Sequence, residues 1–288
     1  MKAVVIPNIQ KEKALSCTQN VCKQLYQYQI ESIIDSNLKK YFDEKPYISF
    51  QPISQATNEA AFAIAIGGDG TILRCAKYVI GKNISLLGIN TGTLGFMASI
   101  ESEQLNELSR LKSGDYRISK RMMICGDLID SRGNIIYHCT ALNDITVNRQ
   151  FSRVFDFEVY RNDVLLGSYR SDGVIFSTPT GSTAYALSAG GPIIEPEFPC
   201  IELSLICPHV YFARPILFSP ETRLRVVLKT HHMNDSYICA DGEAPIIFKE
   251  DYILEVYRSP HELNLIDLSG NTFFDSLSNK LIQPLKRI

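Results

Sequence analysis

A short run of glycines around one aspartate is the stretch whose residue types point most directly to chemistry. Residues 63–66 are apolar, and Gly67-Gly68-Asp69-Gly70-Thr71 follows them directly. A strand that leads through a glycine-rich turn into a helix can hold phosphate, because backbone N–H groups approach the anion where no Cβ intervenes. Asp69 would repel phosphate unless a metal ion lies between them, or unless it takes a proton from an attacking hydroxyl. The turn therefore indicates phosphoryl transfer, while a plain turn with Asp69 as a helix cap remains the alternative.

A second glycine-rich stretch follows the next apolar run. It is Asn90-Thr91-Gly92-Thr93-Leu94-Gly95-Phe96, directly after residues 86–89. The carboxyl ends of parallel strands meet at one edge of a sheet, where ligands collect, so both glycine-rich stretches are expected there. Phe96 either closes over an aromatic ligand or packs as an ordinary core side chain.

An amide beside a carboxylate, Asn143-Asp144, stands at the start of a third apolar run. A carboxylate accepts hydrogen bonds from hydroxyls, and an amide both donates and accepts, so the pair suits a sugar diol such as ribose. The alternative is an Asx turn that leads into a strand, and these two residues alone leave both interpretations open.

The run over residues 169–192 is the most informative part of the chain. It contains Ser177-Thr178-Pro179-Thr180-Gly181-Ser182-Thr183-Ala184-Tyr185. A strand that ends in such a turn exposes hydroxyls and backbone groups that suit a base or a sugar, and Tyr185 offers a stacking face. Ser182 or Thr183 is expected to cap a short helix. A hydroxyl-rich turn with a structural tyrosine is the alternative, and the length of the glycine-punctuated stretch favours a ligand site.

Apolar periodicity places these motifs on alternating strands and helices. Strands are expected over residues 3–6, 62–66 and 86–89, and helices over residues 11–38, 71–80 and 101–112. The first helix has one apolar face, formed by Ala14, Cys17, Val21, Leu25 and Tyr28, and the last has Leu105, Leu108 and Leu111. Such alternation implies parallel pairing with right-handed crossovers, and therefore an α/β domain. The two glycine-rich stretches follow the second and third of these strands.

After Gly114 the pattern changes to short strands and turns. Hairpins are expected over residues 122–130 with 135–140 and 155–161 with 164–169, and more strands over residues 200–206, 224–229, 237–240, 246–248 and 252–257. This pattern predicts an all-β, sandwich-like domain. The tail, residues 272–282, has apolar residues at helical spacing and predicts a last helix.

The predicted fold class is thus an N-terminal α/β domain with a parallel sheet, followed by an all-β C-terminal domain. The first domain covers residues 1–115 and is joined by the C-terminal helix, residues 271–288, while the β-rich domain covers residues 116–270. Because no linker separates the two, a rigid cleft between them is expected.

Composition narrows the class of protein. The 288 residues carry 29 basic and 31 acidic side chains without a dense basic cluster, so nucleic acid is not an expected partner. No apolar run approaches the ~20 residues of a membrane span, and the N-terminus is typical of a strand rather than a signal peptide. The eight cysteines lack zinc spacing and are expected to be reduced thiols of a cytoplasmic protein.

Residues 67–71, 90–96, 143–144 and 172–188 together closely resemble the motifs of the NAD kinase family, in that family's order. Lipid kinases and 6-phosphofructokinases carry related glycine–aspartate motifs, whereas the run at residues 177–185 is far more specific. The resemblance implies transfer of the terminal phosphoryl group of ATP, or of polyphosphate, to the adenosine ribose 2′-hydroxyl of NAD, giving NADP. It also implies Mg²⁺ held mainly by donor phosphates, a site between the domains, a last helix packed on the first domain, and a homodimer or homotetramer.

The resemblance implies roles for individual residues. Asp69 matches the catalytic aspartate, read as the base for the 2′-hydroxyl, and Asn143 and Asp144 match the pair that grips the ribose hydroxyls. Asp172 matches the contact to the nicotinamide carboxamide. The other NAD-binding residues implied are Gly70, Phe96, Thr183, Ala184, Tyr185, Ala186, Leu187 and Ser188. The phosphate-binding residues implied are Gly68, Gly70, Thr71, Arg74 and Arg170.

Three positions depart from the family pattern: Asp144 stands where many members have Glu, Thr93 where some have a larger residue, and Glu243 where many have Gln. Two other functions remain as alternatives. If the chain were a lipid or sphingoid kinase of the related fold, a hydrophobic acceptor tunnel would be expected in the β domain. A nucleotide-sensing binding protein would lack turnover, and the presence of both Asp69 and Asn143 argues against it.

Overall fold

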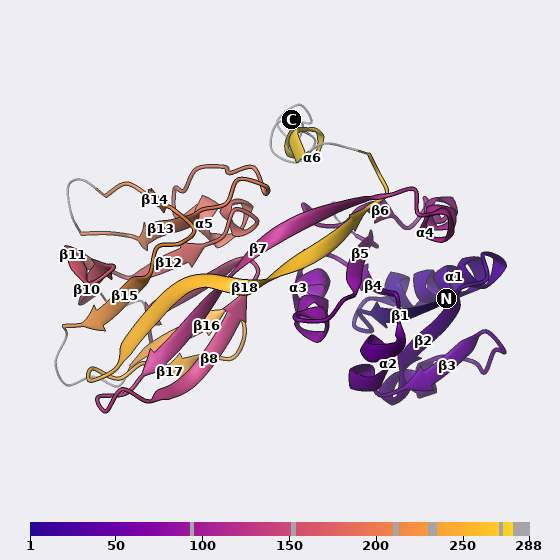
Figure 1. The fold of residues 1–288 in the computed structure, drawn as a ribbon, viewed down its shortest axis with the longest axis horizontal. Coiled ribbons are helices and arrows are strands. Elements are labelled where there is room, and N and C mark those ends of the chain that lie inside the picture. The colour runs from indigo at the N-terminus through magenta and orange to yellow at the C-terminus, as the bar shows by residue number, and fades with distance from the viewer. Residues whose placement is uncertain (93–94, 151–153, 210–212, 230–234, 271–272, 279–288) are drawn as a thin grey trace. The chain divides into compact units, whose positions relative to one another are not determined.

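The computed structural model describes residues 1–92, 95–150, 154–209, 213–229, 235–270 and 273–278. The chain divides into two compact units (Figure 1). The first comprises Met1–Lys120 and Leu263–Ile288, and the second comprises Arg121–Glu262. Each unit has a hydrophobic core of its own. Among the described residues, no helix has the length and apolar character needed to cross a membrane.

The first unit contains a parallel sheet between layers of helices. Its strands follow the order β5-β4-β1-β2-β3, with β6 added on β5, and the described pairings among them are parallel. The strands are β1 (Lys2–Pro7), β2 (Glu31–Asp35), β3 (Ile48–Gln51), β4 (Phe62–Gly67), β5 (Ser85–Asn90) and β6 (Ile100–Glu101). Every residue of β4 is buried, as expected for a strand covered on both faces. The predicted α/β domain with a parallel sheet is confirmed.

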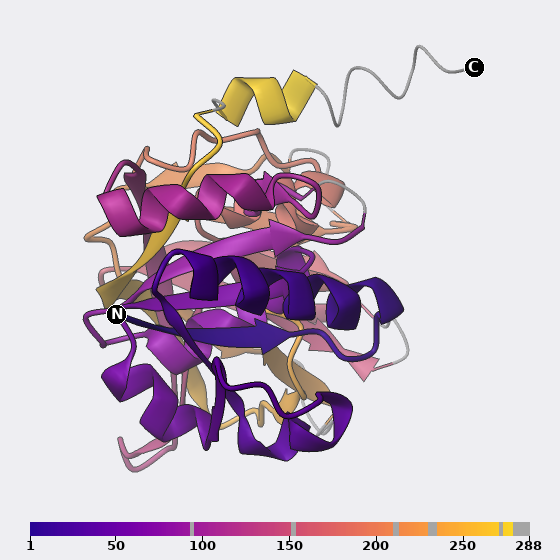
Figure 2. The same ribbon diagram turned by 90° about the vertical axis from the view of Figure 1, so that its right-hand side faces the viewer.

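The helices of this unit are α1 (Glu12–Gln27), α2 (Ile53–Glu59), α3 (Asp69–Val79), α4 (Ser109–Ser113), α6 (Phe273–Leu277) and the 3-10 helices η1 (Ser36–Tyr41) and η2 (Leu105–Leu108). Figure 2 shows α1 lying across one face of the sheet. It buries Ala14, Val21 and Leu25 there, in the same core as Ile64 of β4. The predicted apolar face of this helix is therefore confirmed.

The predicted helix over residues 11–38 is wrong beyond α1. Gln29 has a φ of 60°, its N–H donates to the Tyr26 carbonyl, and the next N–H donates to the Leu25 carbonyl. These two bonds, 3.0 and 2.8 Å long, form a Schellman motif in which a residue other than glycine takes the left-handed position. The buried pair Ile33-Ile34 then forms β2, because β-branched side chains favour strands.

Two further differences concern short elements. β3 and α2 were not predicted, because neither carries a long periodic apolar pattern. The predicted helix over residues 101–112 is instead β6 followed by η2 and α4, which end before Gly114 at a φ of 77°. Leu105, Leu108 and Leu111 still face the core, so the apolar spacing was correct although the continuous helix was not.

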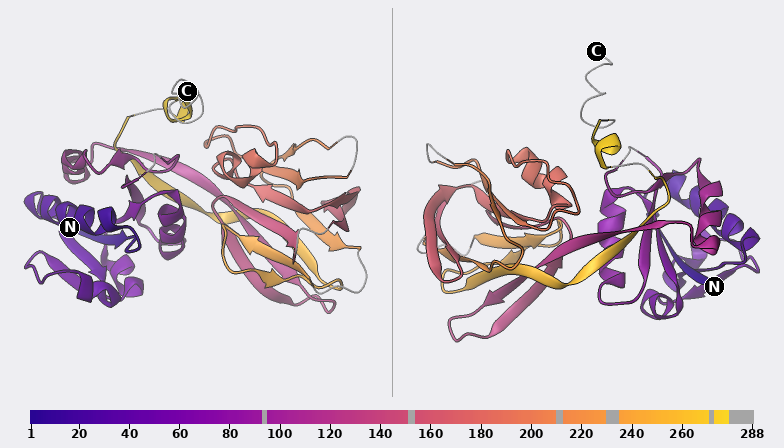
Figure 3. Two further views of the ribbon diagram at one scale, coloured as in Figure 1. Left: turned by 180° about the vertical axis from the view of Figure 1, so that it is seen from behind. Right: turned by 45° about the horizontal axis from the view of Figure 1, so that its top comes forward.

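The second unit contains two antiparallel sheets. One has the order β14-β13-β12-β9-β16-β17, and the other contains β11-β10-β15-β18 together with β7 and β8. The strands are β7 (Arg117–Ile129), β8 (Ile135–Ala141), β9 (Asp144–Arg149), β10 (Phe155–Arg161), β11 (Val164–Ser171), β12 (Gly173–Ser177), β13 (Ile201–Ile206), β14 (Ile216–Phe218), β15 (Leu224–Leu228), β16 (Ser236–Ala240), β17 (Ile246–Ile247) and β18 (Ile253–Asp267). Both sheets contribute to one core, with Val147 from β9 and Phe157 from β10. Figure 3 shows the strands of this unit in two further views. The predicted sandwich-like domain and both hairpins are confirmed.

The end of β18 is tied to the loop that follows β5. Ser99 Oγ accepts the N–H groups of Leu268 at 2.6 Å and Ser269 at 3.3 Å. Farther along, the ring of Phe273 lies 6.3 Å from the ring of Phe96. α6 thus contacts the first unit through Phe273, although no residue of α6 is buried. Of the predicted tail helix, the structure shows α6, and residues 271–272 and 279–288 lie outside the described part of the chain.

Candidate active site

The first glycine-rich motif is the junction between β4 and α3. β4 ends at Gly67, and α3 begins at Asp69 with Gly68 as its N-cap. A Cβ on Gly67 would lie 2.2 Å from the hydroxyl oxygen of Thr71, so this position has no room for a side chain. Gly70 has open space around it. Because the first N–H groups of a helix lack intrahelical partners, this strand–turn–helix junction can receive an anion.

The second glycine-rich turn holds the Asp69 carboxylate. Its oxygens accept the N–H groups of Phe96 at 2.7 Å and Met97 at 3.2 Å. A Cβ on Gly95 would lie 1.9 Å from Oδ1 of Asp69, so glycine is needed for the turn to close around the carboxylate. Asp69 is half-buried and is the first residue of α3 rather than its cap. The two bonds orient the carboxylate, which has roughly four acceptor sites in all. Thr93 lies outside the described residues.

Lys11 lies near both turns, and the sequence analysis did not single it out. Its ammonium nitrogen is 3.7 Å from where a Cβ on Gly68 would lie and 3.6 Å from the corresponding point on Gly92. Within the described residues, this ammonium makes no hydrogen bond or ion pair. Parallel pairing could have revealed it, because Pro7 of β1 lies opposite Ile66 of β4 and the loop after β1 therefore begins beside the glycine turn.

The two arginines predicted to bind phosphate lie in different units. Arg74 is exposed, one turn into α3. Arg170, in β11 of the second unit, has its guanidinium nitrogen 3.8 Å from the carboxylate of Asp156. It does not line the pocket that contains the nearby Asp172.

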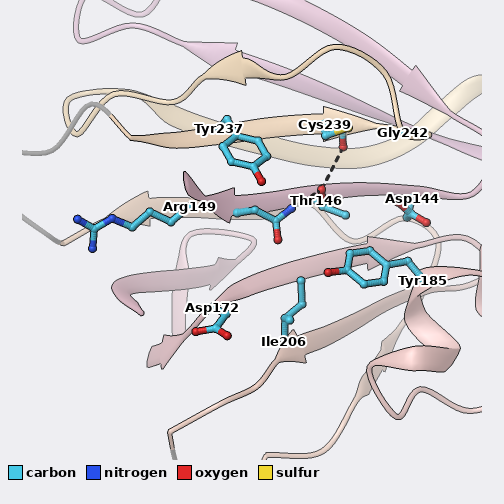
Figure 4. A pocket seen from close by; sticks show the side chains of 10 residues that line it. Asp144, Thr146, Arg149, Asp172, Tyr185, Ile206, Tyr237, Cys239 and Gly242 are labelled. Atoms are coloured by element: carbon cyan, nitrogen blue, oxygen red, sulfur yellow. Dashed lines mark hydrogen bonds between the residues drawn. The ribbon is translucent and has the colours of Figure 1, made fainter. Parts of the chain in front are cut away.

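A pocket of about 380 Å³ lies within the second unit (Figure 4). It brings together three predicted residues: Asp144 at the start of β9, Asp172 between β11 and β12, and Tyr185 at the start of α5 (Tyr185–Ser188). Figure 4 shows the Tyr185 ring between the two carboxyl groups. The Tyr185 residue is 44% exposed, so the ring remains available for stacking. The other lining residues are Thr146, Asn148, Arg149, Ile206, Tyr237, Cys239 and Gly242.

Several of these lining residues share one face of two paired strands. Thr146 lies opposite Cys239, and Asn148 lies opposite Tyr237, in the register of β9 and β16. Alternation along strands places residues i and i+2 on one face, so this set follows from Asp144 once the pairing is known. Arg149 is held by an ion pair with Asp235 at 2.7 Å.

Asp144, one of the residues that line the pocket, has a large upward shift of its pKa. It is 7% exposed, and burial, with a smaller contribution from the negative charge of Asp241, raises the pKa of its carboxyl to about 7. Near neutral pH the group therefore divides between a neutral form that donates a hydrogen bond and an ionised form that accepts. The two forms would meet a sugar hydroxyl differently, the neutral form as a donor and the ionised form as an acceptor, so NAD binding should change as Asp144 ionises.

The Ser/Thr/Pro/Gly run uses part of its hydroxyls for its own loop. Ser182 is fully buried, donates to the Pro179 carbonyl at 2.8 Å and accepts the Ile194 N–H at 3.0 Å. The prediction that Ser182 or Thr183 caps the following helix is wrong, because the N-cap of α5 is Ala184 and no side chain caps it. In the predicted NAD-binding segment, Ser188 is exposed like Tyr185, whereas Thr183, Ala184 and Leu187 are half-buried and Ala186 is fully buried.

Potential metal ligands and thiols were compared across the described part of the chain. Among the described residues, no group of three or more His, Cys, Asp or Glu side chains is placed to hold a metal ion. All eight cysteines are free thiols. Burial raises the pKa of Cys22 to about 11 and that of Cys75 to about 12, so these thiols are poor nucleophiles.

Comparison with known proteins gives matches across both units. The ATP-NAD kinase N-terminal domain matches residues 4–116, and the ATP-NAD kinase C-terminal domain matches residues 142–268. The NAD kinase of Caldanaerobacter subterraneus subsp. tengcongensis is 36% identical over 292 residues, covering 98% of this chain and 99% of its own. The NAD kinase of Moorella thermoacetica is 40% identical over 220 residues, covering 76% of this chain and 70% of its own.

Solved structures of NAD and NADH kinases share the fold of this chain. The yeast NADH kinase, solved in complex with NADH, shares the fold with a TM-score of 0.88 at 20% identity, covering 98% of this chain and 87% of that chain. An NAD kinase from Archaeoglobus fulgidus, solved in complex with ATP, gives a TM-score of 0.75 at 25% identity and covers 97% of this chain and 98% of its own. With both domain models matched and relatives 36% identical over nearly the full length, this chain belongs to the NAD kinase family.

Proposed function

We propose how this chain performs the reaction of its family, the ATP-dependent phosphorylation of NAD to NADP. Residues 1–115, together with residues 271–288, hold the phosphoryl donor, and residues 116–270 hold NAD. The observation that carries the proposal is the pocket that joins Asp144, Asp172 and Tyr185. Two carboxyl groups beside an exposed aromatic ring suit a nucleotide that has ribose hydroxyls and flat rings.

The donor's phosphates bind at the N-terminus of α3. Gly68 and Gly70 offer backbone there, and the helix dipole favours negative charge. The Thr71 N–H donates to the Gly68 carbonyl at 2.8 Å, so Thr71 contributes by holding the turn that receives the phosphate. The Lys11 ammonium above the same turn adds a full positive charge. Arg74, one turn along the helix, is the second cation within reach of a donor chain.

The acceptor binds in the pocket of the second unit. Asn143 and Asp144 hold the ribose hydroxyls, Asp172 holds the nicotinamide carboxamide, and Tyr185 stacks on a ring of NAD. Ala186, whose side chain is buried, contributes through its backbone. The remaining contacts to NAD come from Gly70, Phe96, Thr183, Leu187, Ser188 and Ala184, and Arg170 meets the 2′-phosphate of the product.

Asp69 is the general base. The 2′-oxygen of the ribose forms a bond to the terminal phosphorus of ATP, the bond from that phosphorus to the bridging oxygen breaks, ADP leaves, and the hydroxyl proton passes to Asp69. The N–H groups of Phe96 and Met97 orient the carboxylate in advance. Phosphoryl transfer depends mostly on such positioning and on charge neutralisation.

Mg²⁺ is expected to enter with the donor. The described residues contain no cluster of three or more potential ligands, so donor phosphates would supply most of its oxygen ligands, with Asp69 as a single carboxylate beside them. When bound, the ion neutralises phosphate charge.

Three finer features also belong to the proposal. The chain assembles as a homodimer or homotetramer, it acts in the cytoplasm, and polyphosphate is the alternative phosphoryl donor to ATP. The free state of all eight cysteines supports the cytoplasmic location, because reduced thiols persist there.

The experiment is an assay of the purified chain with NAD and Mg²⁺, in which ATP and polyphosphate are offered in turn and NADP is detected. NADP formation with ATP is the expected result. NADH offered as a second acceptor shows whether the reduced cofactor is also phosphorylated. Diacylglycerol and sphingosine are offered as acceptors in the same assay, because a lipid or sphingoid kinase would phosphorylate them. Phosphorylation of either lipid without NADP formation would replace the proposal with a lipid kinase. NAD binding by calorimetry without NADP formation would indicate a binding protein.

A further inference from the structure

Asp241 makes an unusual set of hydrogen bonds to the segment that carries the ribose-binding pair. One carboxylate oxygen accepts the N–H of Leu142 at 2.8 Å, and the other accepts the N–H groups of Asn143 at 2.8 Å and Asp144 at 3.2 Å. In return, the N–H of Asp241 donates to the Asp144 carbonyl at 3.0 Å. Three consecutive backbone donors thus point at one side chain that lies 97 to 99 positions away in the sequence.

The turn that carries Asp241 has a special backbone. It connects β16 to β17, with a φ of 49° at Asp241 and 73° at Gly242. Aspartate and asparagine tolerate this left-handed conformation better than other side chains, which narrows the residue types suited to this position. The N–H of Glu243 closes the turn by donating to the Ala240 carbonyl at 3.0 Å.

The same segment is held from its other side by the Ser/Thr/Pro/Gly run. The Thr178 N–H donates to the Asn143 carbonyl at 2.8 Å, and the Thr178 hydroxyl donates to the Leu142 carbonyl. A Cβ on Gly181 would lie 2.1 Å from the Asn143 carbonyl oxygen, so the two segments are in close contact. Leu142 and Thr178 are fully buried, and water cannot replace these bonds.

We propose that Asp241 is a positioning residue for the NAD site, which fixes the Asn143-Asp144 pair so that both side chains meet the ribose. The inference rests on the proposed function of that pair. The Asp241 carboxylate accepts the three N–H groups of the segment, and Thr178 donates to the carbonyls of Leu142 and Asn143, so the segment is held from both sides. The pocket is therefore formed before NAD arrives, which lowers the ordering cost of binding.

Asp241 also acts on Asp144 through its charge. The titratable groups that interact with Asp144 are Asp241, Tyr185 and Cys239. Burial raises the pKa of both Tyr185 and Cys239, so neither adds negative charge near pH 7. Removal of the Asp241 charge is therefore expected to lower the pKa of Asp144, an effect that can be measured separately from a change in the NAD KM.

The test compares Asp241→Asn with Glu243→Gln, an exposed residue two positions along the same turn. Both variants lose one negative charge, and asparagine also accepts the left-handed backbone. In Asp241→Asn the amide group turns a donor toward one of the three N–H groups. We expect the NAD KM to rise about fivefold or more, with the ATP KM unchanged. The inflection of kcat/KM with pH that belongs to Asp144 moves to lower pH, while Glu243→Gln keeps the wild-type values.

A second variant, Asp241→Glu, keeps the charge but lengthens the side chain by one methylene. It is expected to raise the NAD KM without moving the pH inflection, which separates position from charge. If one of these two Asp241 variants does not fold, the NAD KM of the other still tests the inference. The inference is overturned if a variant with a wild-type melting temperature also has a wild-type NAD KM and pH profile.

Calorimetry keeps this test separate from the proposed function. If the wild-type chain forms no NADP, the proposed reaction fails, and the Asp241 inference is judged by the NAD dissociation constant alone. Weaker NAD binding in Asp241→Asn then supports the inference, and unchanged binding overturns it.

Discussion

The carboxylate of Asp69 accepts the backbone N–H of Phe96 at 2.7 Å, across 27 positions of sequence. One glycine-rich turn supplies the acid and the other supplies the donors that orient it. Gly95 is required between them, because a Cβ there would lie 1.9 Å from the acid's oxygen. The two motifs therefore work as one unit, and substitutions in either should affect the same step.

Replacement of the base should separate binding from chemistry. Asp69→Ala is expected to lower kcat by about 10²–10⁴, because general-base assistance is lost, while NAD binding remains measurable. The measurements are initial rates of NADP formation and the NAD dissociation constant by calorimetry. Asp115→Asn is the matched control, since it removes an exposed carboxylate that pairs with Arg110 at 3.1 Å. Near wild-type turnover in Asp69→Ala would sink the proposed role.

Lys11 should act on the donor and not on the acceptor. Lys11→Met keeps the aliphatic stem but removes the ammonium beside Gly68 and Gly92, so the ATP KM is expected to rise about tenfold, as for a lost charge-assisted contact. The NAD KM should not change. Lys13→Met, two positions away and also exposed, is the control. An equal rise in the ATP KM of both variants would show a general charge effect, which added salt would remove.

Tyr185 should contribute its ring rather than its hydroxyl. Tyr185→Ala removes the exposed aromatic face of the pocket, and the NAD KM is expected to rise about tenfold, since an aromatic pair is worth roughly 1 kcal/mol beyond its buried area. Tyr185→Phe keeps the ring and should stay within about twofold of wild type. Steady-state kinetics at saturating ATP give both values, and a large effect in the phenylalanine variant would contradict stacking as the main contribution.

The raised pKa of Asp144 should appear in the stability of the protein. Its pKa is about 7 in the folded chain against a reference of 3.8, so the folded state binds more protons between these values. The contribution of Asp144 to the free energy of unfolding therefore falls as pH rises through that window. Asp144→Asn lacks this dependence and is expected to gain stability over wild type above pH 7, by up to roughly 4 kcal/mol.

Urea denaturation at pH 5 and pH 8 checks this expectation for Asp144. The stability difference between Asp144→Asn and wild type should be larger at pH 8. Glu243→Gln, which removes an exposed carboxylate, serves as the control. An identical difference at the two pH values would show that Asp144 ionises normally.

The local patterns that predicted the fold were those with a strong period or a fixed turn chemistry. Alternating strands and helices gave the parallel sheet, and apolar spacing gave the buried face of α1. The end of that helix could not be predicted, because Gln29 supplies a left-handed position usually taken by glycine. The energetics of that turn depend on tertiary packing, which overrides local preference.

The residues of the site were likewise predictable where they lie in local motifs and not where they depend on distant partners. Asp144, Asp172 and Tyr185 were singled out from sequence and share one pocket. Lys11 and Asp241 were not, because their importance comes from pairing partners far away in the chain. Such partners become visible only when strand register is known, since neither residue lies within residues 67–71, 90–96, 143–144 or 172–188, whose residue types pointed to chemistry.

The bonds of Ser99 to Leu268 and Ser269 give the far end of the chain a practical importance. Ser99 stands two positions after Met97, whose N–H is bound by Asp69, and the Phe96 ring meets Phe273. A protein shortened to residue 266 would lose both of these bonds to the loop that steadies the base, and it would lose the buried Leu268 from the core of the first unit. Shortened forms of the protein, made for crystallisation or for sensors, should therefore retain Leu268 and Ser269.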